Sequence, residues 1–163
     1  MTRPPRSRPS DLRVFEISGS GTAGTGTTFC LTGRDTGGLS ELYGWIETVV
    51  SGLNLPDDLL HAMHIAVEEA AANVALHGFP AGQTGKVSIR FQSSREAAVL
   101  TLEDDGRPFD PTCAAPLAPP ASPEDTAPGG LGLILMRRFC SDIAYEHVSG
   151  RNRLTLRFPL AAA

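Results

Sequence analysis

Apolar residues recur at two spacings along this chain, and the spacing separates helices from strands. Between residues 35 and 52 they lie three and four positions apart, the period of an amphipathic helix. A longer helix is predicted from Asp57, directly after a proline, to about His77, with Gly78 as its end. A third, short helix is predicted over residues 133–140.

Alternating or continuous apolar runs predict the strands. These runs cover residues 12–17, 28–33, 86–92, 97–104, 142–148 and 152–158. The last four are short enough and close enough in the chain to form two antiparallel hairpins. Antiparallel strands with segregated helices indicate an α+β protein. We expect a two-layer α/β sandwich, with three helices on one face of a mixed, mostly antiparallel sheet.

Two segments fit no regular element. Residues 1–10 are basic and rich in proline and serine, which is typical of a disordered tail ahead of a single domain over residues 11–163. Residues 111–128 contain six prolines and neither lysine nor arginine. Prolines at this density exclude a regular helix or strand. A loop of this length in a compact domain is usually functional or disordered.

Composition narrows the classes of function. The net charge of −4 argues against nucleic acid as a partner. No apolar run approaches the ~18 residues of a membrane span. The three cysteines show no CxxC or Cys/His spacing, which argues against a disulfide framework and a zinc site. We therefore expect a cytoplasmic protein.

The longest helix carries the most informative pair of polar residues. At about 100° per residue, Glu69 and Asn73 share a face with small and apolar neighbours. The other polar residues of the helix fall on an arc predicted to face solvent: Asp57, His61, His64 and Glu68. A carboxylate among apolar groups needs a partner. That partner is either a cation or metal–phosphate assembly over the helix, or the backbone of a neighbouring strand.

Two glycine-containing segments are further candidates. Asp104 and Gly106 follow a buried strand, where a carboxylate can accept from an exocyclic amine and a glycine lets a flat ring approach. An ordinary strand-ending turn is the alternative. Gly130 and Gly132 precede the third helix, where free N–H groups suit phosphate. A plain loop–helix junction is the alternative there.

Two other patterns fail their own tests. The glycines of residues 19–24 match GxGxxG, but a strand pattern follows them where a dinucleotide site needs a helix. His61, His64 and Glu68 do not have the order of a zinc-binding HExxH helix.

The three candidate segments occur in one order: VEEAAANVALHG, EDDGRPFDP, a long loop, then GGLGL. This order resembles the GHKL ATP-binding superfamily and, within it, the anti-sigma-factor serine/threonine kinases of bacterial partner switching. The resemblance covers roughly residues 28–158. It implies the histidine-kinase-like ATPase fold, ATP and Mg²⁺ as cofactors, and phosphoryl transfer.

The resemblance also implies roles for the residues near the phosphates. Asn73 would ligate Mg²⁺, and Glu69 would orient or deprotonate the attacking hydroxyl or water. Residues 111–128 would be the ATP lid, and Gly130 and Gly132 would present N–H groups to phosphates.

At the other end of the nucleotide, the resemblance places the adenine. Asp104 would hold the adenine amine, Gly106 would pack near the ring, and Thr155 would complete the pocket.

The implied partners are a STAS anti-anti-sigma factor, which would be phosphorylated, and a sigma factor, which would be sequestered. A homodimer is the usual state in such a family. The alternative is a non-catalytic module that switches partners in a nucleotide-dependent way. It is favoured by the absence of lysine and arginine from residues 111–128, where a cation would hold the γ-phosphate.

Overall fold

The computed structural model describes residues 15–16, 27–32, 38–81, 83, 85–113 and 131–160. The predicted basic tail and most of the predicted lid lie outside these ranges. The elements in chain order are β1 (Phe15–Glu16), β2 (Thr27–Thr32), α1 (Gly38–Val50), α2 (Asp57–Asn73), η1 (Val74–Gly78), β3 (Lys86–Ser93), β4 (Ala97–Asp104), η2 (Pro111–Cys113), α3 (Leu131–Phe139), β5 (Asp142–Val148) and β6 (Arg151–Pro159).

The described strands form one sheet in the order β1-β2-β3-β4-β6-β5. Every neighbouring pair in it is antiparallel, so the mixed component that we expected is absent from the described sheet. Both predicted hairpins form. The β5–β6 hairpin turns through Ser149 and Gly150, whose φ values of 54° and 76° suit the right-handed twist of the strands.

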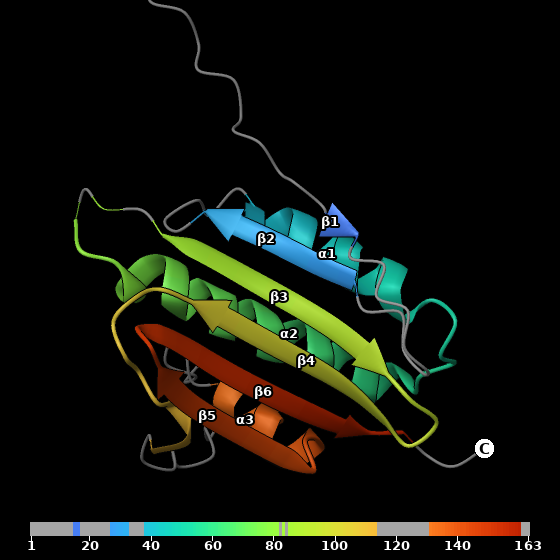
Figure 1. Ribbon diagram of the computed structural model, residues 1–163. Helices are drawn as coiled ribbons and strands as arrows, with labels where there is room; N and C mark the ends of the chain where they lie inside the picture. The colour runs from blue at the N-terminus through green and yellow to red at the C-terminus, as the bar shows by residue number, and fades with distance from the viewer. Residues whose placement is uncertain are drawn as a thin grey trace, which may run out of the picture.

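The three helices cover one face of this sheet (Figure 1), which confirms the α+β two-layer prediction. The alternating burial of β6 places every second side chain against the helices. The largest fully buried side chains come from both layers: Phe29, Leu42, Ile46, Met63, Val67, Val87, Ile89, Leu100, Leu156 and Phe158. The core therefore lies between the sheet and the helices, and no helix among the described residues covers the other face of the sheet (Figure 1).

Two differences from the predicted helix ends bear on the cavity described below. The long helix reaches Gly78 as predicted, but its last turn is the π-helical segment η1. Such segments are rare and often lie at functional sites. The third helix begins at Leu131, so Gly132 lies inside its first turn rather than ahead of it.

His64 corrects the prediction for the polar arc of the long helix. Its side chain was expected to face solvent, but the residue is 3% exposed. Its Nε2 lies 2.8 Å from Oε1 of Glu47, and its ring stacks on Tyr43 with 3.9 Å between centroids. Both partners belong to α1, which covers this part of α2. The angular positions of residues around one helix do not show which of them a neighbouring helix covers.

Cys30, Cys113 and Cys140 are free thiols, in keeping with the prediction that the chain has no disulfide framework. None of the helices described here has the length and apolar character needed to cross a lipid bilayer.

Candidate functional site

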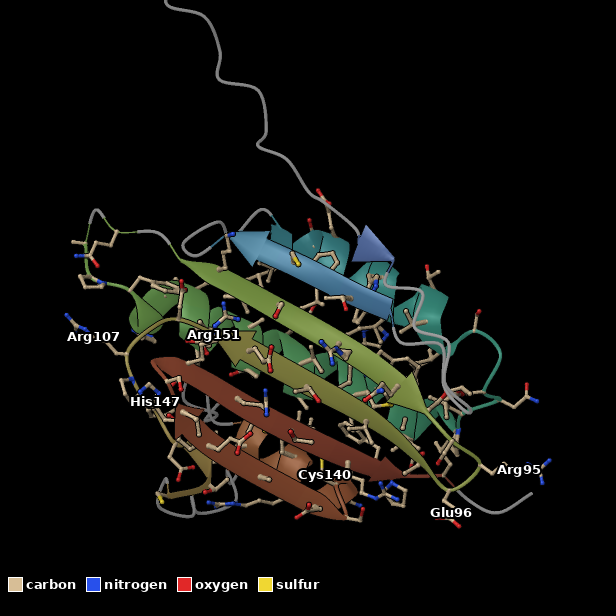
Figure 2. The ribbon with its side chains drawn as sticks, in the orientation of Figure 1. Arg95, Glu96, Arg107, Cys140, His147 and Arg151 are labelled. Atoms are coloured by element: carbon tan, nitrogen blue, oxygen red, sulfur yellow. The ribbon has the colours of Figure 1, made fainter. Side chains whose placement is uncertain are left out.

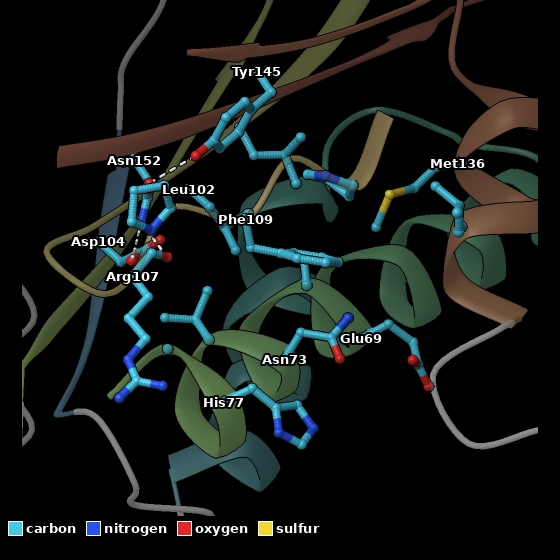
Figure 3. Close-up of a pocket in the computed structure, with 17 residues that line it drawn as sticks. Glu69, Asn73, His77, Leu102, Asp104, Arg107, Phe109, Met136, Tyr145 and Asn152 are labelled. Carbon is cyan, nitrogen blue, oxygen red and sulfur yellow. Dashed lines mark hydrogen bonds between the residues drawn. The ribbon is translucent and has the colours of Figure 1, made fainter. Parts of the chain in front are cut away.

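A cavity of about 610 Å³ opens between the C-terminal part of α2, the helix α3 and one end of the sheet. Figure 3 shows its walls: Glu69, Asn73 and His77 project from the long helix, and Asp104 and Asn152 project from the sheet opposite. Most of the lining between these polar groups is apolar, including Leu102, Leu133, Met136 and Leu154. The cavity thus has a polar group at each end and an apolar middle, as small-molecule sites commonly have.

Glu69 and Asn73 both line this cavity, as their shared helix face predicts. Among the residues that the structure describes, neither side chain takes part in a hydrogen bond or an ion pair, and neither has a polar atom buried without a partner. The alternative in which a neighbouring strand's backbone satisfies the pair is therefore not what the described structure shows. Both groups remain available to a ligand in the cavity.

Gly132 brings α3 against Glu69. A Cβ added at Gly132 would lie 2.3 Å from Cβ and 2.5 Å from Cγ of Glu69, so the two helices touch at this glycine. The N-terminus of α3, where backbone N–H groups lack partners within the helix, therefore lies beside Glu69. Gly130, the other glycine predicted to face phosphates, lies outside the described residues.

Replacing Gly132 by alanine is expected to push α3 away from α2, because neither Cβ nor Cγ of Glu69 can swing clear like a side-chain tip. We expect the free energy of unfolding to fall by about 1–3 kcal/mol, measured by denaturant titration. Gly44→Ala is the matched control: Gly44 lies within α1 with nothing within 4 Å of an added Cβ. This control should gain about 0.5–1 kcal/mol. A Gly132→Ala protein as stable as the wild type would contradict the close contact.

Asp104 forms the opposite wall and is 8% exposed. Its Oδ1 accepts two hydrogen bonds, from Nδ2 of Asn152 at 2.7 Å and from the N–H of Gly106 at 2.9 Å. Burial raises the pKa of this carboxyl above its ordinary value, while the two hydrogen bonds oppose that rise. Within the described structure, both hydrogen bonds end on Oδ1, which leaves Oδ2 for a donor in the cavity.

Gly106 is placed beside the cavity but is not part of its lining. A Cβ at this position would lie 2.8 Å from the carbonyl oxygen of Gly78. The next residue, Arg107, donates its N–H to that same carbonyl at 2.8 Å. The close approach that this glycine permits is therefore between the end of the long helix and the loop after β4.

Thr155 does not reach the cavity, which corrects the prediction that it completes the pocket. It pairs with Thr101 of β4, and its buried neighbours Leu154 and Leu156 face the helices, so Thr155 faces the side of the sheet away from the helices. Asn152 of β6 lines the cavity, because it lies on the same face of the strand as Leu154 and Leu156. The alternation of polar and apolar residues in NRLTLRF already indicates which side chains of this strand face the helices.

The mouth of the cavity has a basic and an aromatic side chain that sequence reasoning did not assign. Arg107 and Phe109 line it, and Phe109 is 60% exposed. Figure 2 shows Arg107 and His147 at the same end of the sheet, far from the β3–β4 turn at Arg95.

The described start of the predicted lid, η2, is in contact with α3, because Nη2 of Arg137 donates a hydrogen bond to the Thr112 carbonyl at 3.4 Å.

The arrangement suits an elongated ligand with a hydrogen-bond donor at one end and anionic groups at the other. No group of three His, Cys, Asp or Glu side chains that could hold a metal gathers in the described ranges. A hard cation beside Asn73 would therefore take most of its oxygen ligands from the bound molecule. Mg²⁺ is commonly bound in this way, through a few protein oxygens together with substrate phosphates.

Comparison with known families agrees with this geometry. A family model described as "Histidine kinase-like ATPase domain" matches residues 34–158. The match includes α1 to α3 and the strands β3 to β6, and so all the described walls of the cavity.

Individual relatives are protein kinases. The chain is 32% identical to serine/threonine-protein kinase BtrW of Bordetella bronchiseptica, over 69% of this chain and 79% of that one. It is 32% identical to serine-protein kinase RsbW of Bacillus licheniformis and 29% identical to RsbW of Bacillus subtilis; each match covers 68% of this chain and 74% of the relative.

Solved structures match at the level of the fold. The histidine kinase domain of the Erythrobacter litoralis EL346 blue-light activated histidine kinase superposes with a TM-score of 0.52 at 19% identity. The match covers 76% of this chain and 59% of that one.

Proposed function

This chain belongs to the histidine kinase-like ATPase family and is related to the serine kinases RsbW and BtrW; on that basis we propose that it is an ATP-dependent serine/threonine protein kinase of the anti-sigma-factor type. The observation that carries the proposal is the Glu69–Asn73 pair on α2, which has no hydrogen-bond partner among the described residues and faces Asp104 across a cavity. The pair suits the phosphate end of a nucleotide, and the buried carboxylate suits the base.

The cavity residues fit ATP and Mg²⁺. When bound, ATP supplies the transferable phosphoryl group, and Mg²⁺ supplies positive charge that offsets the phosphate oxygens. Asn73 would ligate the cation through its amide oxygen, which has no partner in the described structure. Asp104 would accept from the adenine amine through Oδ2, and the apolar middle of the cavity would exclude water from the ring.

Glu69 would take the proton from the attacking hydroxyl. The acceptor serine or threonine would lose this proton as its oxygen forms the new bond to phosphorus, and the bond broken would be the one that joins the transferred phosphoryl group to ADP. Gly132 holds α3 against the side chain of Glu69, so the helix whose N–H groups would face the phosphates would also position Glu69 as the base. The protein's contribution is mainly orientation and charge stabilisation.

The partners follow from the family resemblance. The acceptor would be a STAS anti-anti-sigma factor, and the alternative partner a sigma factor, with this chain acting as a homodimer in the cytoplasm. The names of RsbW and BtrW support the kinase activity and say nothing of these partners.

A second function is a binding module that changes partners on nucleotide binding without phosphoryl transfer. It is favoured by the absence of lysine and arginine from residues 111–128. The guanidinium that does line the described cavity is that of Arg107, at its mouth.

Phosphoryl transfer separates the two functions. The chain is incubated with γ-labelled ATP, Mg²⁺ and a STAS protein encoded near it, and the label on the STAS protein is followed. Label on a serine or threonine supports the kinase. Tight ATP binding without any label excludes the kinase and supports the binding module.

Replacing Asp104 by asparagine should weaken ATP binding while the hydrogen bonds that Asp104 makes within the protein are kept. The amide oxygen can keep the hydrogen bonds from Asn152 and Gly106, but an NH₂ group replaces Oδ2 and faces the adenine amine. We expect ATP affinity to fall about 10–100-fold, the effect of losing a hydrogen bond to a charged group. Titration calorimetry measures it. Asp105→Asn is the control, because Asp105 is exposed and does not line the cavity.

The same variant has a pH signature. Because the pKa of Asp104 is raised on folding, the folded protein holds a proton that the unfolded chain has lost. The stability that this bound proton contributes is therefore fully present below the ordinary pKa of aspartate. It is lost as the pH rises through the raised pKa of Asp104 in the folded protein. Without nucleotide, Asp104→Asn should lose less stability across this window than the wild type. An equal or larger loss would contradict the burial of this charge.

A further inference from the structure

Asn152 is buried behind Asp104 and uses its whole amide group within the protein. Its Nδ2 donates to Oδ1 of Asp104 at 2.7 Å and to the carbonyls of Gly106 and Arg107, both at 3.2 Å. The residue is 5% exposed, so water does not compete for these positions. The amide therefore joins the end of β6 to the carboxylate and to the loop after β4.

The other end of the amide fixes its orientation. Oδ1 of Asn152 accepts from the Tyr145 hydroxyl at 2.8 Å, and Nδ1 of His147 lies 2.8 Å from the same oxygen. Because an amide oxygen only accepts, His147 must carry its proton on Nδ1. Turning the amide over would set its oxygen against a carboxylate and two carbonyls. Figure 3 shows the resulting line of contacts from Tyr145 through Asn152 to Asp104.

We propose that Asn152, held in one orientation by Tyr145 and His147, is the positioning residue that sets the base preference of the nucleotide site. This inference rests on the proposed function, because it requires a nucleobase at Asp104. The donor from Asn152 and the N–H of Gly106 both lie on Oδ1, where they favour the ionised form of Asp104 against the effect of burial; in that form Oδ2 accepts a hydrogen bond from the base.

The network therefore selects a purine with an amine at position 6. A 6-amino group donates to Oδ2, whereas a 6-oxo group would set a carbonyl oxygen against a carboxylate. A buried polar site of this kind discriminates strongly, because the wrong ligand leaves its groups unpaired. Without Asn152, Oδ1 loses a donor and a buried carboxyl more readily takes up a proton, which lets it donate to a 6-oxo group.

The test compares ATP with inosine triphosphate, which differs only at position 6 and the adjoining N1. Dissociation constants are measured by titration calorimetry for the wild type and for Asn152→Leu, which has the same branched arrangement of side-chain heavy atoms and no polar side-chain atom. We expect the wild type to prefer ATP by about 100-fold or more. The variant should reduce that preference at least about tenfold, a ratio that a merely structural loss would not change.

A second variant keeps the test possible if Asn152→Leu does not fold. Tyr145→Phe combined with His147→Ala leaves Asn152 in place but removes both contacts to its oxygen, so the amide is held from its Nδ2 end alone. Tyr145 is half-buried and His147 exposed, so this double variant changes no fully buried side chain. It should also lower the preference for ATP. Thr155→Val, on the same strand but the opposite face, should leave it unchanged.

Each outcome decides. A lower preference in each variant that folds, with Thr155→Val unchanged, supports the inference. A preference within twofold of the wild type in either folded variant, or a wild type that binds the two nucleotides equally, overturns it and leaves the nucleotide site standing. A wild type that binds neither nucleotide overturns the proposed function itself, and this inference with it.

Discussion

Replacing Asn73 by alanine is expected to abolish magnesium-dependent binding of ATP. Asn73 offers an amide oxygen to the cavity, and in the described structure nothing else engages it. Mutation of groups that only support a metal ligand typically costs 10–100-fold in affinity, and loss of a ligand itself should exceed about 100-fold. Titration calorimetry with ATP and Mg²⁺ measures the change.

Two comparisons distinguish a ligand from a structural residue. Asn73→Asp keeps an oxygen at the same position and should retain binding in the presence of Mg²⁺. Without Mg²⁺, the weak ATP binding of Asn73→Ala and of the wild type should converge. If Asn73→Ala folds and binds magnesium–ATP as tightly as the wild type, the residue has only a structural part.

Replacing Glu69 by glutamine is expected to keep ATP binding and to slow phosphoryl transfer about 10²–10⁴-fold. Glutamine has the shape of glutamate, so the contact of Cβ and Cγ with Gly132 is kept. What is lost is the capacity to take a proton from the acceptor hydroxyl. Transfer of label from γ-labelled ATP to the STAS protein measures the rate, and calorimetry measures the binding.

The neighbouring acid gives a matched control. Glu68 belongs to the same helix and is half-buried, but it does not line the cavity. Glu68→Gln makes the same chemical change one position away and should transfer at the wild-type rate. Equal rates in the two variants, or normal transfer by Glu69→Gln, would show that Glu69 is not the base.

Periodicity predicted most of the fold because each layer buries one face. The alternation in β3 and β6, and the three- and four-residue spacing in α1 and α2, mark the faces that meet in the core. The order of strands in the sheet was not predicted, because it depends on contacts between segments far apart in the chain. The burial of His64 was missed for the same reason: α1 supplies its partners.

The sequence predicted those site residues whose polar side chains interrupt an apolar face of a helix. Glu69 and Asn73 stood out because polar groups interrupt an apolar face, and the structure sets them opposite Asp104 in one cavity. The prediction for Thr155 rests on the family resemblance and goes against the alternation of its own strand. Asn152 was missed because its importance lies in hydrogen bonds to β5 and to the end of β4.

The central claim is that the cavity between α2 and the sheet binds ATP together with magnesium. Calorimetric titration of the unmodified chain with ATP, with and without Mg²⁺, tests it most directly. We expect one nucleotide per chain and an affinity for ATP that falls when Mg²⁺ is withheld. Absence of binding under both conditions, from a folded protein, would contradict it.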